Sequence, residues 1–362
     1  MQIYDSSLPM KQSQISNVLN DDRLVFFPTV GRQDHESGQW LLPIHGWIFR
    51  QEDDSRRRAA GLAILHRVLR LSKQDGETEM LDRRLRAFMV DNQGEKLVVI
   101  RIAGLEYPLS PSEANGHFMD VVRLPEQTVA IAGQSGSSDG ATTIDRWISF
   151  EAILPNADAP LAAGVVHLLP DVGLSVISDI DDTIKVTHVG QRRKLLRQTF
   201  TREFEPVAGM AELYARWQAA GAAFHYVSRS PWQLYEPLAA FIAACGFPLG
   251  AFHLRHFRWR QGSTLRADAD RDLKQRIIQE MITTFPERRF VLVGDSGERD
   301  PEVYAEIARA FPDQTQAVLI RNTTGEPARG ERFLQAFADI SPERWQVFDD
   351  PAELTEFQLA TG

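Results

Sequence analysis

The chain has one cysteine, Cys245, among its 362 residues, so no disulfide can form within it. No run approaches the roughly 20 apolar residues that a membrane-spanning helix needs. The first 22 residues lack the basic and apolar regions of a secretory signal. These absences predict a reducing, cytoplasmic environment. Cys245 lies in an apolar stretch, which favours a buried core thiol over a nucleophile.

An excess of positive charge is also missing. The 40 Lys and Arg residues face 49 Asp and Glu, a net charge of -9, which argues against a general nucleic-acid binder but leaves room for local basic surfaces. Internal repeats and low-complexity segments are absent as well. What the chain does have is length and 43% hydrophobic residues, enough for more than one ordinary domain, so we expect two.

Residues 23–160 have the texture of a small antiparallel β domain, for which the sequence indicates no chemistry. Apolar stretches broken by Gly, Ser and Pro predict strands at 23–30, 40–49, 97–102, 118–124, 128–132 and 146–154. Helical patterns over 62–69 and 81–89 predict a helical insertion in this domain. A polar segment, 1–22, precedes it, and the Ala- and Pro-rich segment 155–170 predicts a junction between domains.

Strands and helices alternate from residue 171 to residue 350, and the tail 351–362 follows. Strands are predicted at 175–178, 224–228, 290–294 and 317–320, and helices at 209–220, 232–245, 303–310 and in a stretch where Leu273, Ile277, Met281 and Ile282 share a face. This alternation predicts an α/β domain: a parallel sheet with right-handed crossovers and helices on both faces.

Acidic residues are crowded at the end of the first of these strands. The apolar run stops at Asp179, and Asp181 and Asp182 follow at once, with Thr183 in the same alternating register as Asp179 and Asp181. Such carboxylates repel one another unless a cation neutralises them or their protonation shifts. Carboxylate and carbonyl oxygens favour a hard ion, and Mg²⁺ is our expectation. An acidic loop that only caps the next element is the alternative.

Four segments place polar groups where the strand ends of a parallel sheet converge on one crevice. They are 179–183, 227–232, the helix carrying Lys274, and 294–300. Together they contain the parts that phosphoryl transfer through a covalent intermediate needs.

We expect Asp179 to be the nucleophile that forms an aspartyl-phosphate, and Asp181 to be the acid/base that protonates the leaving alcohol and then activates water. Ser228 would donate a hydrogen bond to the phosphate, and Lys274 would counter its developing negative charge. Asp300 would hold Lys274 or reach the metal through water.

The expected metal ligands are the carboxylates of Asp179 and Asp295 and the main-chain carbonyl of Asp181, with Thr183 in support. Ordinary structural roles remain open at this point. Ser228 and Asp300 are also candidate helix N-caps, Lys274 is a candidate solvated lysine, and 294–297 a candidate tight turn.

These segments resemble a known family. They read SDIDDTIK, YVSRSPWQLY, DLKQRII and FVLVGDSGERDPEVYAEIA, and they are similar to the four motifs of the haloacid-dehalogenase-like phosphatases. The closer resemblance, over about 172–321, is to the catalytic domain of the actin-patch phosphatidate phosphatase family, which is related to lipins. It implies the same roles for Asp179, Asp181, Ser228, Lys274, Asp295 and Asp300. Arg229 and Leu273 depart from the family, which often has Asn and His there.

The resemblance implies an Mg²⁺-dependent phosphomonoesterase that converts phosphatidate to diacylglycerol and phosphate. A soluble phosphomonoester or a phosphoprotein as substrate, and a non-catalytic phosphatidate-binding module, are the alternatives. Two basic segments with apolar or aromatic residues, 191–202 and 253–260, suit peripheral contact with an anionic membrane. Solvated flaps, dimer contacts and stacking on nucleobases are the competing interpretations, and nucleic acid is the least favoured because the chain is acidic. Oligomeric state and pathway cannot be predicted.

Overall fold

A computed structural model describes residues 16–51, 75–134, 146–155, 162–187, 197, 199–256, 273–355 and 357. The chain divides into two compact units. The first comprises Met1–Arg58 and Arg86–Pro170, and we call it the β-rich unit. The second, the α/β unit, comprises Ala59–Leu85 and Asp171–Gly362. No helix of the described ranges is long and apolar enough to cross a membrane.

The β-rich unit is built on one extended, mostly antiparallel sheet. Its strands are β1 (Asp22–Phe27), β2 (Thr29–Asp34), β3 (Gln39–Gln51), β4 (Val90–Asn92), β5 (Val99–Ile102), β6 (Leu105–Pro108), β7 (His117–Pro125), β8 (Arg146–Ile153) and β9 (Ala163–Leu168). Their order is β1-β3-β2-β9-β8-β5-β6, with β4 and β7 also paired to β3. The pair β2–β9 is parallel. The long strand β3 is central to this unit because four other strands pair with it.

Two expectations for this part of the chain are wrong. Residues 128–132 lie in helix α3 (Glu126–Gln134), not in a strand. The predicted junction contains β9, which pairs with both β2 and β8 and so belongs to the sheet.

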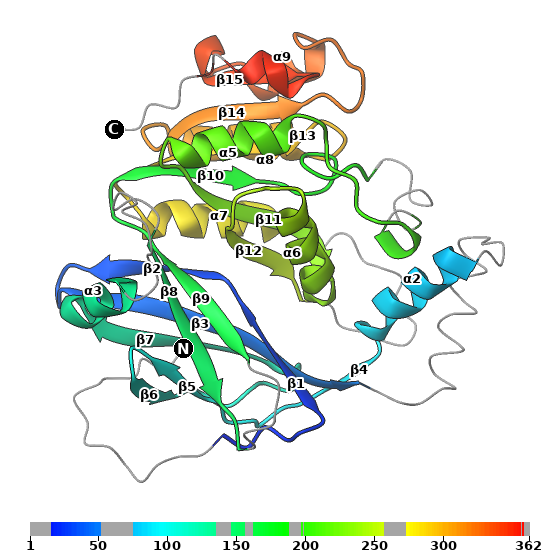
Figure 1. The fold of residues 1–362 in the computed structure, drawn as a ribbon. Helices are drawn as coiled ribbons and strands as arrows, with labels where there is room; N and C mark the ends of the chain where they lie inside the picture. The colour runs from blue at the N-terminus through cyan, green and yellow to red at the C-terminus, as the bar shows by residue number, and fades with distance from the viewer. Residues whose placement is uncertain are drawn as a thin grey trace. The chain divides into compact units, whose positions relative to one another are not determined.

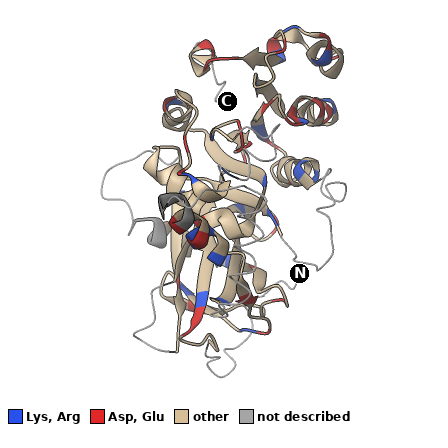
Figure 2. Cartoon of the chain, turned by 90° about the vertical axis from the view of Figure 1, so that its right-hand side faces the viewer, with Lys and Arg blue, Asp and Glu red and all other residues tan. Residues whose placement is uncertain are grey.

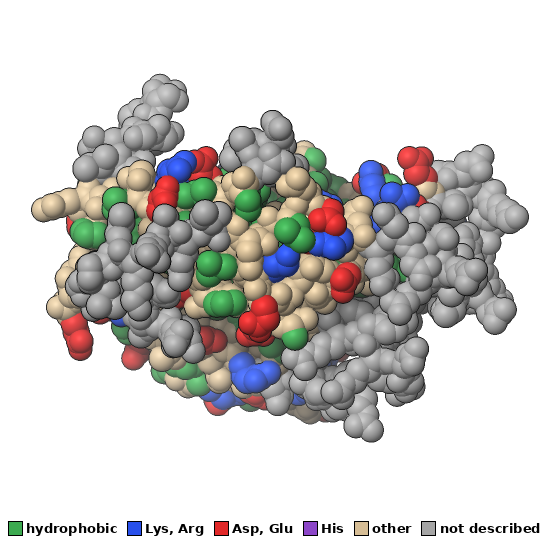
Figure 3. All heavy atoms as spheres, turned by 90° about the horizontal axis from the view of Figure 1, so that it is seen from below, with side chains coloured by type: hydrophobic (Ala, Val, Ile, Leu, Met, Phe, Trp, Pro, Cys, Tyr) green, Lys and Arg blue, Asp and Glu red, His purple; other side chains and the backbone are tan. Residues whose placement is uncertain are grey.

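In Figure 3 the coloured part of the face seen from below carries its hydrophobic side chains in separate small groups, without a continuous apolar surface.

The α/β unit contains a six-stranded parallel sheet. Its strands are β10 (Gly173–Ser178), β11 (Ala223–Pro231), β12 (Ala251–Arg255), β13 (Arg288–Asp295), β14 (Thr315–Arg321) and β15 (Trp345–Phe348), in the order β12-β11-β10-β13-β14-β15. Every neighbouring pair is parallel. The order reverses around β10, so its carboxyl end lies at a topological switch point, where such sheets bind ligands.

Helices cover both faces of this sheet. They are α5 (Met210–Ala219), α6 (Tyr235–Ala244), α7 (Leu273–Thr284), α8 (Asp300–Ala310) and α9 (Glu331–Ala336), with short 3₁₀ turns η1 (Trp232–Leu234), η3 (Pro342–Arg344) and η4 (Pro351–Leu354). Figure 1 shows α5 and α6 in front of the sheet and α7 and α8 behind it, as right-handed crossovers require. The strands themselves carry few charges, which lie on helices and loops instead (Figure 2). The predicted fold class, an α/β parallel sheet with helices on both faces preceded by a smaller β-rich region, is confirmed.

Helix α2 (Asp75–Arg86) differs from its expected place. We expected residues 81–89 to be part of an insertion in the β domain, but nearly all of α2 groups with the α/β unit. The other predicted helical stretch, 62–69, lies outside the described residues.

Cys245 is half-buried, less than we expected for a core thiol, and its partial burial raises the pKa of its thiol.

The buried face of α7 matches the predicted one at Met281 and Ile282 but differs by one position in the first half of the helix. Lys274, Ile278, Met281 and Ile282 are its buried residues, whereas Leu273 and Ile277 are only partly covered. A lysine occupies the first core-facing position, so a pattern of apolar residues alone selects the wrong neighbours. A buried lysine needs a compensating partner, and the carboxyl edge of the sheet provides it.

Candidate active site

The carboxyl edge of the parallel sheet brings the predicted residues together. Asp179 follows β10, Ser228 lies in a register irregularity of β11, and Asp295 ends β13. Lys274 and Asp300 stand in the first turns of α7 and α8. All five side chains are buried. Residues more than a hundred positions apart therefore share one site because parallel strands end at the same edge.

Asp179 is held on both carboxylate oxygens. The Lys274 ammonium lies 2.8 Å from Oδ1, and the Thr183 hydroxyl donates to Oδ2 at 3.1 Å. Its own backbone N–H donates to the Val293 carbonyl at 2.8 Å, so the residue continues the pairing of β10 with β13. Lys274 also contacts Asp300 Oδ1 at 2.6 Å. The predicted nucleophile, lysine and supporting aspartate thus form one buried, hydrogen-bonded group.

Asp181 is engaged by a different set of groups. The hydroxyls of Ser228 and Ser230 both donate to its Oδ2 at 3.1 Å. The other oxygen, Oδ1, accepts from Thr187 at 3.0 Å and lies 2.7 Å from the ammonium of Lys185. Asp179 and Asp181 therefore have separate partners, which gives the two carboxyl groups different chemical environments.

A tight turn after β10 separates these two side chains. Asp182 has φ of 55°, in the left-handed region that Asp tolerates better than most residues. Its N–H donates to the Lys185 carbonyl at 2.7 Å, its side chain accepts from Thr187 N at 2.6 Å, and its carbonyl accepts from Arg321 at 2.7 Å. The third acidic residue of the motif thus shapes the loop.

The site offers oxygen ligands of the kind a hard divalent cation takes. One carboxylate oxygen from each of Asp179, Asp295 and Asp300 lies within 4.8 Å of the others. Asp295 Oδ1 accepts from Gly297 N at 2.6 Å and from Thr323 at 3.2 Å, but its buried Oδ2 has no hydrogen-bond partner among the described residues. A buried carboxylate oxygen without a partner is costly unless a proton or cation satisfies it. The residues present therefore fit a divalent metal ion.

The charge balance of the site points the same way. Four buried or largely buried carboxyl groups (Asp179, Asp295, Glu298 and Asp300) face two cationic groups (Lys274 and Arg229), an excess of two negative charges when all are ionised. Arg229 pairs with Glu298, whose other oxygen lies 3.9 Å from Lys274. One divalent cation would neutralise this excess.

Burial and neighbouring charges shift the protonation of these groups. Burial, then Asp300 and Glu298, raise the pKa of Asp295 to about 8. Burial also raises the pKa of Asp179 well above its usual value, although Lys274 works against this. For Asp181 burial has the same tendency, but Lys185 and the hydroxyl donors outweigh it and lower its pKa. Burial opposes charge on Lys274, yet Asp179 and Asp300 more than offset it and raise its pKa.

Several residues of the site were not singled out from the sequence. Lys185, Thr187 and Ser230 touch Asp181, and Glu298 bridges the two cations. Their only sequence signal was proximity to the motif residues. The predicted Asp181 main-chain ligand stays a prediction, and its carboxylate is not part of the three-aspartate group.

Neither predicted N-cap acts as one. Asp300 is the first residue of α8 rather than its cap, and its carboxylate turns to Lys274 and the Asp295 N–H. Ser228 precedes η1 by several residues, and its oxygen accepts from Ser230 N at 2.9 Å. Asp300 pairs with the charged Lys274, and the Ser228 hydroxyl donates to Asp181, so neither side chain caps a helix.

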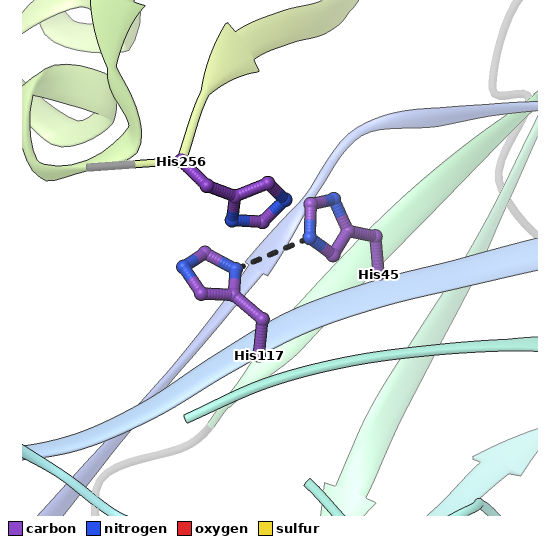
Figure 4. Close-up of side chains that lie close together, drawn as sticks. All are labelled: His45, His117 and His256. Carbon is purple, nitrogen blue, oxygen red and sulfur yellow. Dashed lines mark hydrogen bonds between the residues drawn. The ribbon is translucent and has the colours of Figure 1, made fainter. Parts of the chain in front are cut away.

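The β-rich unit holds a pair of buried histidines. Nε2 of His45 on β3 lies 3.3 Å from Nδ1 of His117 on β7 (Figure 4). The ring of Phe27 packs on His45, and that of Trp47 stacks on His117. These contacts are those of a satisfied aromatic core, and we assign the pair no chemistry.

Part of the chain is similar to known proteins. Residues 174–322 match the family model of "Phosphatidate phosphatase APP1, catalytic domain". The chain is 38% identical over 154 residues to phosphatidate phosphatase APP1 of Saccharomyces cerevisiae, covering 41% of this chain and 26% of that protein. It is 32% identical over 194 residues to an uncharacterized protein of Schizosaccharomyces pombe, covering 51% of this chain and 32% of that protein. The chain thus spans about a third or less of the curated relatives it matches.

Solved structures of two phosphatases also match part of the chain. Phosphoserine phosphatase in its apo form aligns at a TM-score of 0.32 and 12% identity, covering 51% of this chain and 98% of that one. D,D-heptose 1,7-bisphosphate phosphatase from B. bronchiseptica, complexed with magnesium and phosphate, aligns at 0.29 and 14% identity, covering 49% and 93%.

The α/β unit is thus a parallel-sheet domain with a buried aspartate–lysine cluster at its topological switch point. Residues 174–322 of this unit are similar to the catalytic domain of APP1-like phosphatidate phosphatases, by the family model and by 38% identity to the yeast relative. This confirms the family resemblance seen in the sequence.

The raised pKa of Asp295 gives a testable dependence of stability on pH. Because its folded pKa is about 8 against a usual 3.8, the folded state binds a proton more tightly, and stability falls as pH rises between these values. In chelator, Asp295→Asn should therefore melt above the unmodified protein. The gap should widen by about 1 kcal/mol, or roughly 2–4 °C, per pH unit from about pH 5 to about pH 8.

Thermal unfolding followed by fluorescence measures this. Added Mg²⁺ should raise the melting temperature of the unmodified protein near pH 8 but leave that of Asp295→Asn nearly unchanged. A gap that stays constant with pH would contradict the raised pKa, and an equal response of both proteins to Mg²⁺ would contradict the ligand role.

Proposed function

We propose that this chain is an Mg²⁺-dependent phosphomonoesterase that acts through an aspartyl-phosphate on Asp179, with phosphatidate as substrate and diacylglycerol and phosphate as products. One observation carries the proposal: a buried carboxylate, fixed by Lys274 and Thr183, lies within 4.8 Å of a carboxylate oxygen of Asp295, a residue whose Oδ2 has no hydrogen-bond partner among the described residues. A nucleophile next to an acidic metal ligand is what phosphoryl transfer to a carboxylate requires.

Asp179, Asp295 and Asp300 would hold the cation, together with the Asp181 main-chain carbonyl. When bound, Mg²⁺ supplies positive charge that lessens repulsion between the phosphate and these carboxylates. Lys274 adds charge from the protein itself and fixes the orientation of Asp179. The residue set, oxygen ligands only, favours this ion over softer metals.

In the first step a carboxylate oxygen of Asp179 bonds to phosphorus as the ester oxygen leaves with a proton from Asp181. In the second, Asp181 takes a proton from water, which attacks phosphorus and releases phosphate and free Asp179. The low pKa of Asp181 keeps it ionised before substrate arrives, and the phosphate's negative charge nearby would raise its affinity for a proton. Ser228 would donate to a phosphate oxygen.

Phosphatidate as substrate is supported by the family match and by the name of the yeast relative. Peripheral contact with an anionic membrane from the cytoplasm would bring the enzyme to it. Of the basic segments, Arg197 and Arg202 are exposed and Arg255 is partly covered, while most of the other positively charged residues lie outside the described residues. The complete aspartate–lysine set argues against a non-catalytic binding module.

Asp179→Asn tests the nucleophile. The amide cannot form the acyl phosphate, so phosphate release should fall by at least about a thousandfold. A colorimetric phosphate assay measures the rate, and a thermal melt verifies that the variant folds. Arg309→Met, which removes an exposed ion pair with Asp339 on the same unit, is the control and should keep full activity. If Asp179→Asn releases phosphate as fast as the unmodified protein, Asp179 is not the nucleophile.

A substrate panel tests the lipid preference. We expect phosphatidate in vesicles to be hydrolysed with a kcat/KM at least about tenfold above that of inositol phosphates, phosphopeptides and sugar phosphates at one Mg²⁺ concentration. A preference for any soluble member would replace phosphatidate as substrate while keeping the mechanism. Binding to phosphatidate vesicles without hydrolysis of any member would instead support a binding module.

A further inference from the structure

Lys185 is a buried cation that the catalytic scheme does not use. It is 2% exposed, and its ammonium lies 2.7 Å from Asp181 Oδ1. Its backbone is tied on several sides: its N–H donates to the Ile180 carbonyl at 3.0 Å, and its carbonyl accepts from Asp182 N at 2.7 Å and from the Thr187 hydroxyl at 3.1 Å. A lysine buried and anchored in this way has a fixed position, so it can fix the position of its partner.

The contacts of Asp181 show what that position controls. One oxygen is held by Lys185 and Thr187, while the other faces the hydroxyls of Ser228 and Ser230 on β11. Holding Oδ1 leaves Oδ2 directed to the side where a phosphate would meet Ser228. Acid catalysis depends steeply on such placement, since a shift of about 1 Å can cost a hundredfold in rate.

Lys185 is in turn held from outside the matched domain. Its ammonium lies 4.6 Å from the centre of the Phe204 ring, and the guanidinium of Arg84 lies 4.1 Å from the same centre. Arg84 is on α2, is 4% exposed, and donates to the Thr199 carbonyl. Helix α2 precedes residues 174–322 by almost a hundred positions, yet it packs within the α/β unit.

The geometry points to Lys185 as a positioning residue for the acid/base Asp181, braced by Phe204 and by Arg84 of α2. This inference rests on the proposed phosphatase activity. It adds that a helix outside the matched catalytic domain governs how readily the leaving alcohol is protonated. Because both cations contact the same ring, Phe204 links Arg84 of α2 to Lys185.

The test compares two phosphomonoesters in the full chain. p-Nitrophenyl phosphate has a leaving group that departs without a proton, whereas an alkyl phosphate such as glycerol 3-phosphate needs one. Lys185→Met should lower kcat for the alkyl phosphate at least about tenfold more than for the aryl one, with little change in KM. Lys185→Arg, which keeps the charge, should recover much of this loss. Arg84→Met should show the same pattern, about threefold in size.

Arg83→Met is the matched control. Arg83 is the neighbouring residue on α2, is exposed, and meets Glu203 rather than Phe204, so the ratio of the two rates should not change. If Lys185→Met does not fold, Phe204→Leu keeps the apolar bulk and should show the same selective loss. Equal losses on both esters, or no loss, would overturn the inference by leaving a purely structural role.

The inference and the activity fail in different ways. If the unmodified chain hydrolyses both esters and Asp179→Asn hydrolyses neither, the proposed function stands, and the ratios in the Lys185 and Arg84 variants decide the inference alone. If the unmodified chain hydrolyses neither these esters nor phosphatidate in vesicles, both are overturned. If Asp179→Asn remains active, the nucleophile assignment is wrong. The inference about Lys185 would then stand only if the selective loss caused by Lys185→Met disappears when Asp181 is also replaced by Asn.

Discussion

The buried contact of Lys274 with Asp179 and Asp300 is the interaction on which the rest of the site depends. It joins the end of β10 to the first turns of α7 and α8, three elements that the chain reaches at widely separated positions. A lysine at this depth is stable only with such partners, and carboxylates this crowded are stable only with such a cation. The same constraint explains why α7 has a lysine on its core-facing side and why Asp300 does not cap α8.

One cation is not enough for this cluster. Asp295 and Glu298 add further negative charge, and Arg229 offsets only part of it. The surrounding sheet is apolar, so the excess negative charge favours either a second cation or protonation of a carboxyl group. By contrast Asp181 has its own lysine and three hydroxyl donors, which lower its pKa. Two carboxylates of one motif thus differ in proton affinity because their neighbours differ in charge.

Much of this arrangement was predictable from the sequence. The alternation of strands and helices predicts the parallel sheet, and the rule that ligands bind at strand ends brings Asp179, Ser228, Lys274 and Asp295 together. The errors have physical causes. Residues 128–132 have strand-like composition but pack as α3. The first half of the buried face of α7 was predicted one position off because that face includes the charged Lys274. The role of Lys185 depends on Phe204 and Arg84, and no local pattern connects residues so far apart.

The high proton affinity of Asp295 has a consequence for how the protein matures. Near neutral pH a hydrogen ion held by Asp295 would partly neutralise the acidic cluster without metal, so folding would not require a bound metal ion. Loading then becomes an exchange in which the incoming ion expels hydrogen ions into the solvent. Acidification of the surroundings would drive that exchange backwards, and the same carboxylates that recruit the metal would release it.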